Sequence, residues 1–115
     1  KCWKDNRTLK QIKDQKWAAI KTDRDELEFG GFVYNGNIYD SDQVSQGRIL
    51  GAANLGIDQV WTLADNSTVY LSSDELTDLY AALQEHISNL HERSRVAREK
   101  IENAQTIEEI ESVTL

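Results

Sequence analysis

The side chains with the most reactive chemistry are a single cysteine and two histidines. No histidine lies near Cys2 in sequence to activate its thiol, so we interpret it as a passive or intermolecular thiol. His86 and His91 are five residues apart, which turns their rings about 140° away from each other on a helix. Zinc-binding pairs on helices use the i, i+4 spacing instead. We therefore expect two solvated helix histidines and no metal site.

The carboxylates and hydroxyls do not form a recognisable catalytic pattern either. Asp40 stands three residues before Gln43, the spacing of a capping box, so we interpret it as a helix cap and not as a general base. Asp40-Ser41-Asp42 begins like a calcium loop, but the glycine and the distal glutamate of such loops do not follow. No serine sits on a strained turn, and no glycine loop cradles a phosphate. The sequence predicts no catalytic residue, no cofactor and no metal, so we expect the protein not to be an enzyme.

Aromatic side chains provide the one alternative for a binding site. Tyr34, Tyr39 and Tyr70 lie on or beside expected β-hairpins, where exposed rings could stack on a sugar or a peptide. Trp61 alternates with Leu63, which favours core packing for its ring. The three tyrosines are therefore the candidate contacts of a receptor- or glycan-binding module.

The hydrophobic pattern predicts the elements that would position these side chains. In order, we expect a helix over 8–28, a hairpin over 32–39, a helix over 41–55, a hairpin over 60–71, a long helix from residue 72 and a short helix from residue 106. Asn35-Gly36 between apolar runs is a strong signal for a type I′ hairpin turn. The predicted fold class is α+β, rich in helix, with antiparallel strands. The two hairpins could join into one sheet or remain separate ribbons.

The long helix carries a heptad-like ridge of apolar side chains. The candidate interface residues on this ridge are Leu76, Tyr80, Leu83, Ile87, Leu90 and Ile101. Their alternating spacing of four and three is typical of a helix that packs along another helix. That partner could be the first helix of the same chain or a counterpart in another chain.

Two further features bear on packing. Gly47 and Gly51 lie one turn apart in the expected second helix and cost about 1 kcal/mol each relative to alanine. We expect another backbone to pack closely against them. Lys16 and Asp23 interrupt the apolar stripe of the first helix, either as snorkelling surface residues or as a register device between chains.

Length and charge limit the classes of protein. The 115 residues suit one domain, 1–115, with a poorly specified lead-in over 1–7. Because no methionine occurs anywhere, we expect the domain to be part of a longer chain. The net charge is −7, distributed as +2 over 1–29, −3 over 30–72 and −6 over 73–115. Such a chain is a poor partner for nucleic acid, and no apolar run is long enough for membrane insertion.

The order of several short motifs resembles a domain of unknown function found in phage and prophage tail proteins. The motifs are Trp17-Ala18-Ala19-Ile20-Lys21, Arg24-Asp25, Glu28-Phe29-Gly30-Gly31-Phe32, Tyr39-Asp40-Ser41-Asp42, Ser45-Gln46, Arg48-Ile49, Gly51-Ala52, Trp61-Thr62-Leu63-Ala64-Asp65-Asn66 and Thr106-Ile107-Glu108-Glu109-Ile110. The resemblance covers the chain from about residue 9. Members of this family commonly lie near the C-terminus of tail-fibre or tail-fibre-assembly-like proteins, so the resemblance implies that the domain is the C-terminal part of a longer chain. The resemblance supplies no catalytic residue.

These observations favour a structural or assembly module that acts by protein–protein association. The resemblance implies partners in its own parent chain and among other tail proteins, and location in a virion tail or in the host cytoplasm during assembly. The helical ridge allows a homo-oligomer. The alternatives are the receptor- or glycan-binding module described above and, less favoured, a hydrolase of envelope sugars.

Overall fold

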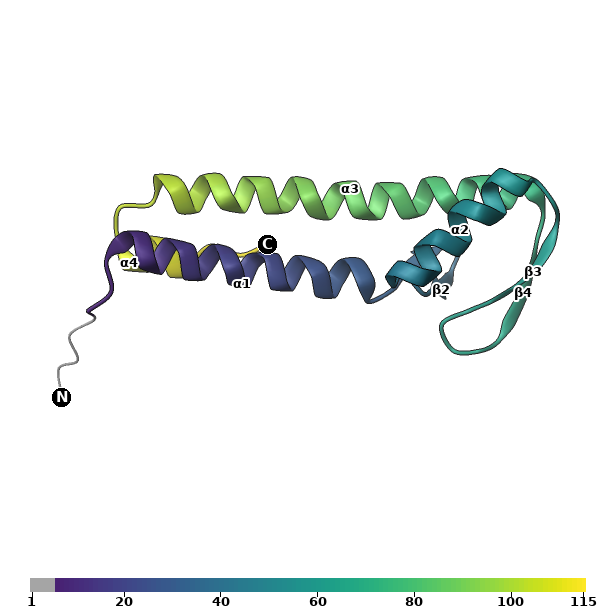
Figure 1. Ribbon diagram of the computed structural model, residues 1–115, viewed down its shortest axis with the longest axis horizontal. Helices are drawn as coiled ribbons and strands as arrows, with labels where there is room; N and C mark the ends of the chain where they lie inside the picture. Colours follow the sequence, from purple (N-terminus) through teal and green to yellow (C-terminus); the bar gives the residue numbers. More distant parts are fainter. Residues whose placement is uncertain (1–5) are drawn as a thin grey trace. The chain divides into compact units, whose positions relative to one another are not determined.

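A computed structural model describes residues 6–115, which form helices and two short hairpins (Figure 1). The elements are α1 Leu9–Phe29, β1 Phe32–Tyr34, β2 Asn37–Tyr39, α2 Gln43–Leu55, β3 Gln59–Thr62, β4 Thr68–Leu71, α3 Ser73–Asn103 and α4 Ile107–Glu111. The predicted α+β class and the order of elements are confirmed. The interpretation of Cys2, and most of the lead-in over 1–7, lie outside the described residues.

The chain forms two compact units. One unit is Asp25–Leu90, and the other combines Lys1–Arg24 with His91–Leu115. The helices α1 and α3 each contribute residues to both units. The prediction of a single domain over 1–115 remains a prediction.

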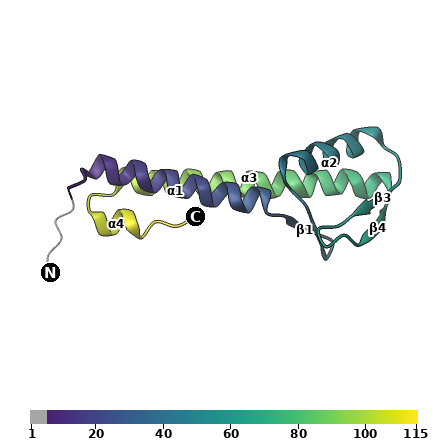
Figure 2. The ribbon, with the colours of Figure 1, turned by 60° about the horizontal axis from the view of Figure 1, so that its bottom comes forward.

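The unit Asp25–Leu90 has a core built from two hairpins and two helices. Hairpin β1–β2, helix α2, hairpin β3–β4 and the first turns of α3 all pack into it (Figure 2). Its buried side chains are Phe32, Tyr39, Ile49, Ala52, Leu63, Leu71, Leu76, Leu79 and Leu83. Leu79 lies outside the predicted ridge yet is completely buried, because several elements cover a wider face of α3 than one helix could.

The hairpins remain separate two-stranded sheets. Asn35 and Gly36 both have positive φ, at 53° and 82°, which confirms the predicted turn between β1 and β2. The backbone N–H of Ala64 donates to the carbonyl of Ile38 at 3.0 Å, and this bond links one hairpin to the other. Of the two arrangements open from the sequence, the structure has the separate ribbons.

A buried polar network joins α1, the first hairpin and α2. The Ser41 hydroxyl is fully buried, donates to the carbonyl of Glu28 at 2.5 Å, and accepts from the N–H of Gly31 at 2.8 Å. The Gln46 side-chain amide donates to the carbonyl of Ser41 at 2.9 Å. Gly31 has φ of 106°, and a Cβ there would come within 3.2 Å of the carbonyl oxygen of Tyr39. These bonds satisfy backbone groups where the chain leaves one helix and enters the next.

Helix α2 begins later than predicted, and its cap is a different aspartate. The N-cap is Asp42, whose carboxylate accepts from the N–H of Ser45 at 3.4 Å and from the Ser45 hydroxyl. The prediction that Asp40 caps this helix through Gln43 is wrong. Asp40 and Asp42 flank Ser41. Because Ser41 is buried, Asp42 is the aspartate that lies at the start of the helix.

The N-cap at Asp42 should make the free energy of unfolding depend on pH. The hydrogen bond from the Ser45 side chain lowers the pKa of Asp42 below its ordinary value. A lowered folded-state pKa adds stability above the unfolded pKa of about 3.9, and that stability is lost as the pH falls through the folded value. In urea titrations between about pH 5 and 2, Asp42→Asn should reduce the loss of stability, because asparagine also caps but does not titrate. Identical pH profiles for the two proteins would contradict this assignment.

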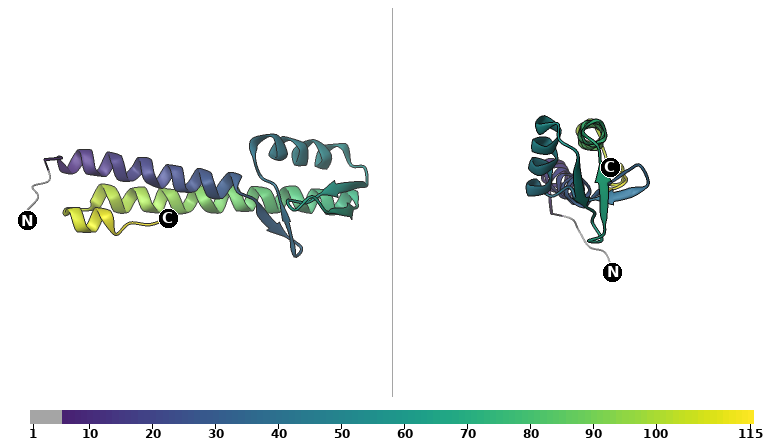
Figure 3. Two further views of the ribbon diagram at one scale, coloured as in Figure 1. Left: turned by 90° about the horizontal axis from the view of Figure 1, so that it is seen from below. Right: turned by 90° about the vertical axis from the view of Figure 1, so that its right-hand side faces the viewer.

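The unit of Lys1–Arg24 and His91–Leu115 packs parts of α1, α3 and α4 together (Figure 3). Ile20, Ala97, Ile101 and Val113 form one buried cluster, and Ile12, Ala104 and Ile110 form another. The opposite net charges of 1–29 and 73–115 predict that the first and last helices lie side by side, and two lysines of α1 bond to the C-terminal part of the chain. Lys13 donates to the carbonyl of Glu102 at 2.9 Å, and Lys16 donates to the carbonyl of Glu111 at 3.2 Å.

The predicted stripe of α1 is only partly buried. Of the four aliphatic residues at helical spacing in this stripe, Ile12 and Ile20 are in the core, but Leu9 and Leu27 are 42% and 46% exposed. Trp17 lies between two cations, with Lys21 Nζ 5.7 Å and Arg98 Cζ 5.4 Å from its ring centroid.

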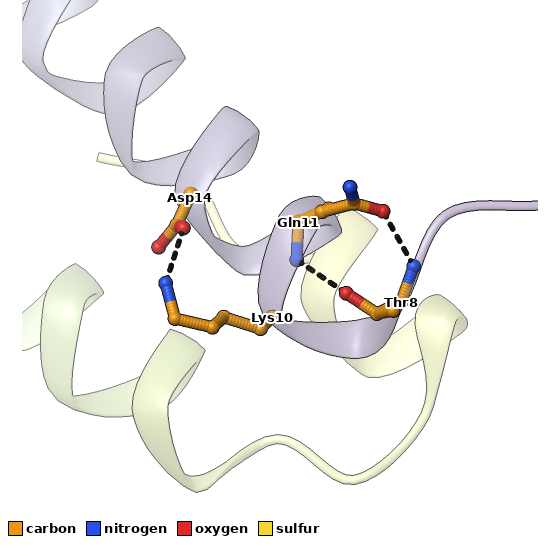
Figure 4. Close-up of polar contacts among 4 residues, drawn as sticks. All are labelled: Thr8, Lys10, Gln11 and Asp14. Atoms are coloured by element: carbon orange, nitrogen blue, oxygen red, sulfur yellow. Dashed lines mark hydrogen bonds and ion pairs between the residues drawn. The ribbon is translucent and has the colours of Figure 1, made fainter.

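Capping boxes define several helix starts. The three-residue spacings of Ser72 with Glu75 and of Thr106 with Glu109 predict two capping boxes. The Ser72–Glu75 box is reciprocal, with bonds of 3.1 and 3.2 Å, as predicted. Thr106 caps α4 by accepting from the N–H of Glu109 at 3.1 Å, also as predicted. A third box at α1 was missed: Thr8 and Gln11 exchange bonds of 2.9 and 3.1 Å (Figure 4).

Candidate functional site

The candidate interface residues of α3 are covered inside the chain. Leu76, Leu83, Leu90 and Ile101 are at most 3% exposed, and Tyr80 and Ile87 are half-buried. In the unit Asp25–Leu90 the ridge packs on hairpins and α2, and in the other unit Ile101 packs against Ile20. A surface that binds another chain must therefore use other residues.

The three candidate ligand-contact tyrosines have different surroundings. Tyr39 is 1% exposed, burial raises the pKa of its hydroxyl, and it is not available to a ligand. Tyr34 is half-buried, with its ring 6.0 Å from that of Tyr39. Tyr70 is 62% exposed, and its hydroxyl donates to Asp58 Oδ2 at 3.1 Å, which raises the pKa of Tyr70. The structure therefore does not bring the tyrosines together as one ligand surface.

The histidines are not solvated in the way the sequence predicted. The ring of His86 is stacked 5.8 Å from that of Phe32, and His86 Nε2 lies 3.0 Å from the carbonyl oxygen of Leu27. His91 is half-buried. His86 therefore has a packing role in the unit Asp25–Leu90, where the first hairpin covers this side of α3.

Among residues 6–115, no group of three or more histidine, cysteine, aspartate or glutamate side chains is placed to bind a metal ion. No helix in the same range combines the length and apolar character that a membrane span requires.

The outward face of α2 exposes three aliphatic side chains. Val44, Leu50 and Leu55 are 61%, 40% and 63% exposed. Gly47 and Gly51 lie between them on the helix surface, at about 100° per residue. A Cβ at either glycine would meet no atom within 4 Å, so the prediction of close backbone packing inside the chain is wrong.

A cleft of about 410 Å³ lies between α2 and β3, within the unit Asp25–Leu90. Its lining residues are Asp40, Ser45, Arg48, Gln59, Val60, Trp61, Thr62 and Asn66. Part of the half-buried Trp61 packs against the core, which holds the ring in place. Sequence reasoning missed this cleft, because its residues come from a loop, a helix, a strand and a turn.

The other unit has a larger cleft of about 620 Å³, between the end of α3 and the C-terminal segment. It includes Glu99, Lys100 and Glu109 but no aromatic side chain. The α2–β3 cleft is therefore the stronger candidate for binding a small ligand, and the α2 face is the stronger candidate for binding a protein.

Comparison with known proteins finds a match to a family model. No curated protein and no solved structure matches the chain. A family model described as "Domain of unknown function (DUF4376)" matches residues 11–114, nearly the range over which the sequence resemblance was expected. Because this match covers almost the whole chain, the protein belongs to the DUF4376 family of domains of unknown function.

Proposed function

We propose that the domain is a non-enzymatic association module of a phage or prophage tail protein. The tail context rests on the motif resemblance, which extends from about residue 9 to the Thr106–Ile110 motif. On this proposal its partners are its own parent chain and other tail proteins, in the virion tail or in the host cytoplasm during assembly. The observation that carries the association is the exposed apolar face of α2.

This face fits a second copy of the chain. Gly47 and Gly51 have no side chains, so the helix surface is low there, with exposed aliphatic side chains on both sides. Leu50 of one copy can therefore pack against the two glycines of the other copy. An exposed glycine in a helix costs about 1 kcal/mol relative to alanine, and nothing inside the chain compensates for that cost. Close approach of a partner helix would do so.

Charge also supports pairing through α2. The segment 43–57 contains no acidic residue and only Arg48 as a charge, although the chain carries −7 overall. Pairing two such faces therefore brings no carboxylates together. A helix of 13 residues is about 20 Å long, so the contact falls below the roughly 800 Å² per partner of a standard interface. We expect a weak dimer alone and a stronger one when the parent chains are already assembled.

Replacing both glycines by alanine separates folding from association. Gly47→Ala with Gly51→Ala should stabilise the monomer by about 1 kcal/mol each, since the added methyl groups enter open space. The same methyl groups keep a partner helix away, so the dimer should weaken by about tenfold or more. Urea unfolding measures the first effect, and light scattering across protein concentration measures the second.

The matched control is Gln84→Ala, on an exposed position of α3. It also improves helix propensity but should leave association unchanged. A wild-type protein that stays monomeric at millimolar concentration would overturn pairing through α2. Equal association by the wild type and the double-alanine variant would overturn it as well.

A further inference from the structure

We propose that the α2–β3 cleft binds a neutral saccharide. This site does not use Tyr34, which is half-buried, or Tyr39, which is buried. It uses the residues that line the cleft instead. It does not require self-association through α2. The cleft's volume of about 410 Å³ is within the roughly 300–1,000 Å³ range of small-ligand sites.

The cleft offers many uncommitted polar groups. All its lining residues except Val60 and Trp61 have polar side chains. Among residues 6–115, the side chains of Asp40, Arg48 and Gln59 form no hydrogen bond or ion pair with one another or with other residues. The side-chain amide of Asn66 is uncommitted in the same sense within this range. A ligand can therefore use these donors and acceptors without breaking bonds in the protein.

The types of polar group match sugar hydroxyls. A hydroxyl both donates and accepts, so it can donate to the Asp40 carboxylate and accept from the Arg48 guanidinium. The amides of Gln59 and Asn66 supply one donor and one acceptor group each. Hydrogen bonds to charged groups are the stronger ones, which makes Asp40 and Arg48 the expected main contacts.

Trp61 supplies the apolar part of the site. Trp61 is one of the residues that line the cleft, and it is also packed against the core. An aromatic ring held by packing binds the C–H face of a sugar at low entropic cost. Val69 lies opposite Trp61 on the neighbouring strand and is also packed against the core, which fixes the position of the strand pair.

Other ligand classes fit the cleft less well. One arginine and one aspartate among the lining residues give no excess positive charge for phosphates, and the chain's charge of −7 opposes polyanions. An apolar ligand would bury many polar groups without partners, which costs free energy. A neutral polyhydroxylated ligand carries no negative charge and can form hydrogen bonds with the polar groups that it covers.

The test begins with a glycan array, followed by titration of the saccharides that bind. Free glucose, galactose and N-acetylglucosamine should be titrated as well. The readout is the ¹H–¹⁵N spectrum, in which the indole N–H of Trp61 and the backbone N–H groups of β3 should shift together. Arg48→Ala should weaken binding by about tenfold or more. Asn66→Gly should weaken it several-fold, since glycine keeps the positive φ of 68° and removes the amide.

The controls identify the surface that binds. Tyr70→Ala removes an exposed ring that does not line the cleft and should leave the affinity unchanged. The Gly47→Ala, Gly51→Ala variant should also bind normally, which separates this proposal from pairing through α2. Loss of binding in Tyr70→Ala with retention in Arg48→Ala would overturn the cleft assignment. Absence of any binding on the array and in millimolar titrations would overturn the saccharide proposal.

Discussion

Leu83→Asp is expected to unfold the unit Asp25–Leu90. Leu83 is 1% exposed and belongs to the core that α3 shares with both hairpins and α2. The substitution removes aliphatic packing and places a carboxylate where no partner is available, a combined cost of more than about 4 kcal/mol. That is a large fraction of the roughly 5–15 kcal/mol that stabilises a typical domain.

Circular dichroism and urea unfolding measure this effect. The matched control is Gln84→Asp, one residue further along α3 on an exposed position, which should change stability by about 0.5 kcal/mol at most. Acid gives a second readout for Leu83→Asp, because burial raises the pKa of the introduced carboxyl. A raised folded-state pKa means the cost is smallest below the unfolded value of about 3.9 and grows as the pH rises. Equal stability of the two variants at neutral pH would show that the ridge is not buried.

Local signals in the sequence predicted most of the elements. Asn35-Gly36 requires positive φ at both residues, so the first hairpin followed from that dipeptide alone. The boxes at Ser72 and Thr106 marked the starts of α3 and α4 because the bonds lie within four residues. The long ridge of α3 was visible because helical periodicity repeats over many turns.

Long-range packing decided the features that were missed. The choice between Asp40 and Asp42 as cap depends on the buried Ser41, whose partners are at Glu28 and Gly31. The glycines of α2 were expected to face another backbone, but apolar and polar residues are mixed around α2, so periodicity did not indicate its buried face. His86 appeared solvated because its contacts, Phe32 and Leu27, are far away in sequence.

The candidate site is harder to predict than the fold. Residues from 40 to 66 meet in the cleft only after α2 and β3 pack on the same core. No two of its charged residues have a spacing that signals binding, and Trp61 alternates with Leu63 as an ordinary core residue would. The sequence placed the candidate ligand contacts on three tyrosines, but it could not show which of these rings are accessible, because accessibility depends on tertiary burial.

Ile110→Ala is the second substitution with a large expected effect. Ile110 is 0% exposed and is the buried residue of α4, which has only five residues. A helix this short is not stable by itself, so packing of Ile110 with Ile12 and Ala104 must hold it in place. Removing a fully buried isoleucine side chain to alanine costs about 2–5 kcal/mol, and urea unfolding should show a loss in this range.

Ile107→Ala provides the comparison, because it removes the same atoms from the same helix at a half-buried position. Its cost should be clearly smaller, since both the lost transfer free energy and the cavity scale with burial. Hydrogen exchange should become faster at the N–H of Glu109, which bonds to Thr106, in Ile110→Ala more than in Ile107→Ala. Equal costs for the two variants would mean that burial does not govern the docking of α4. A larger loss of stability in Ile110→Ala than in Ile107→Ala would show that tertiary packing, together with the Thr106 cap, holds this short helix in place.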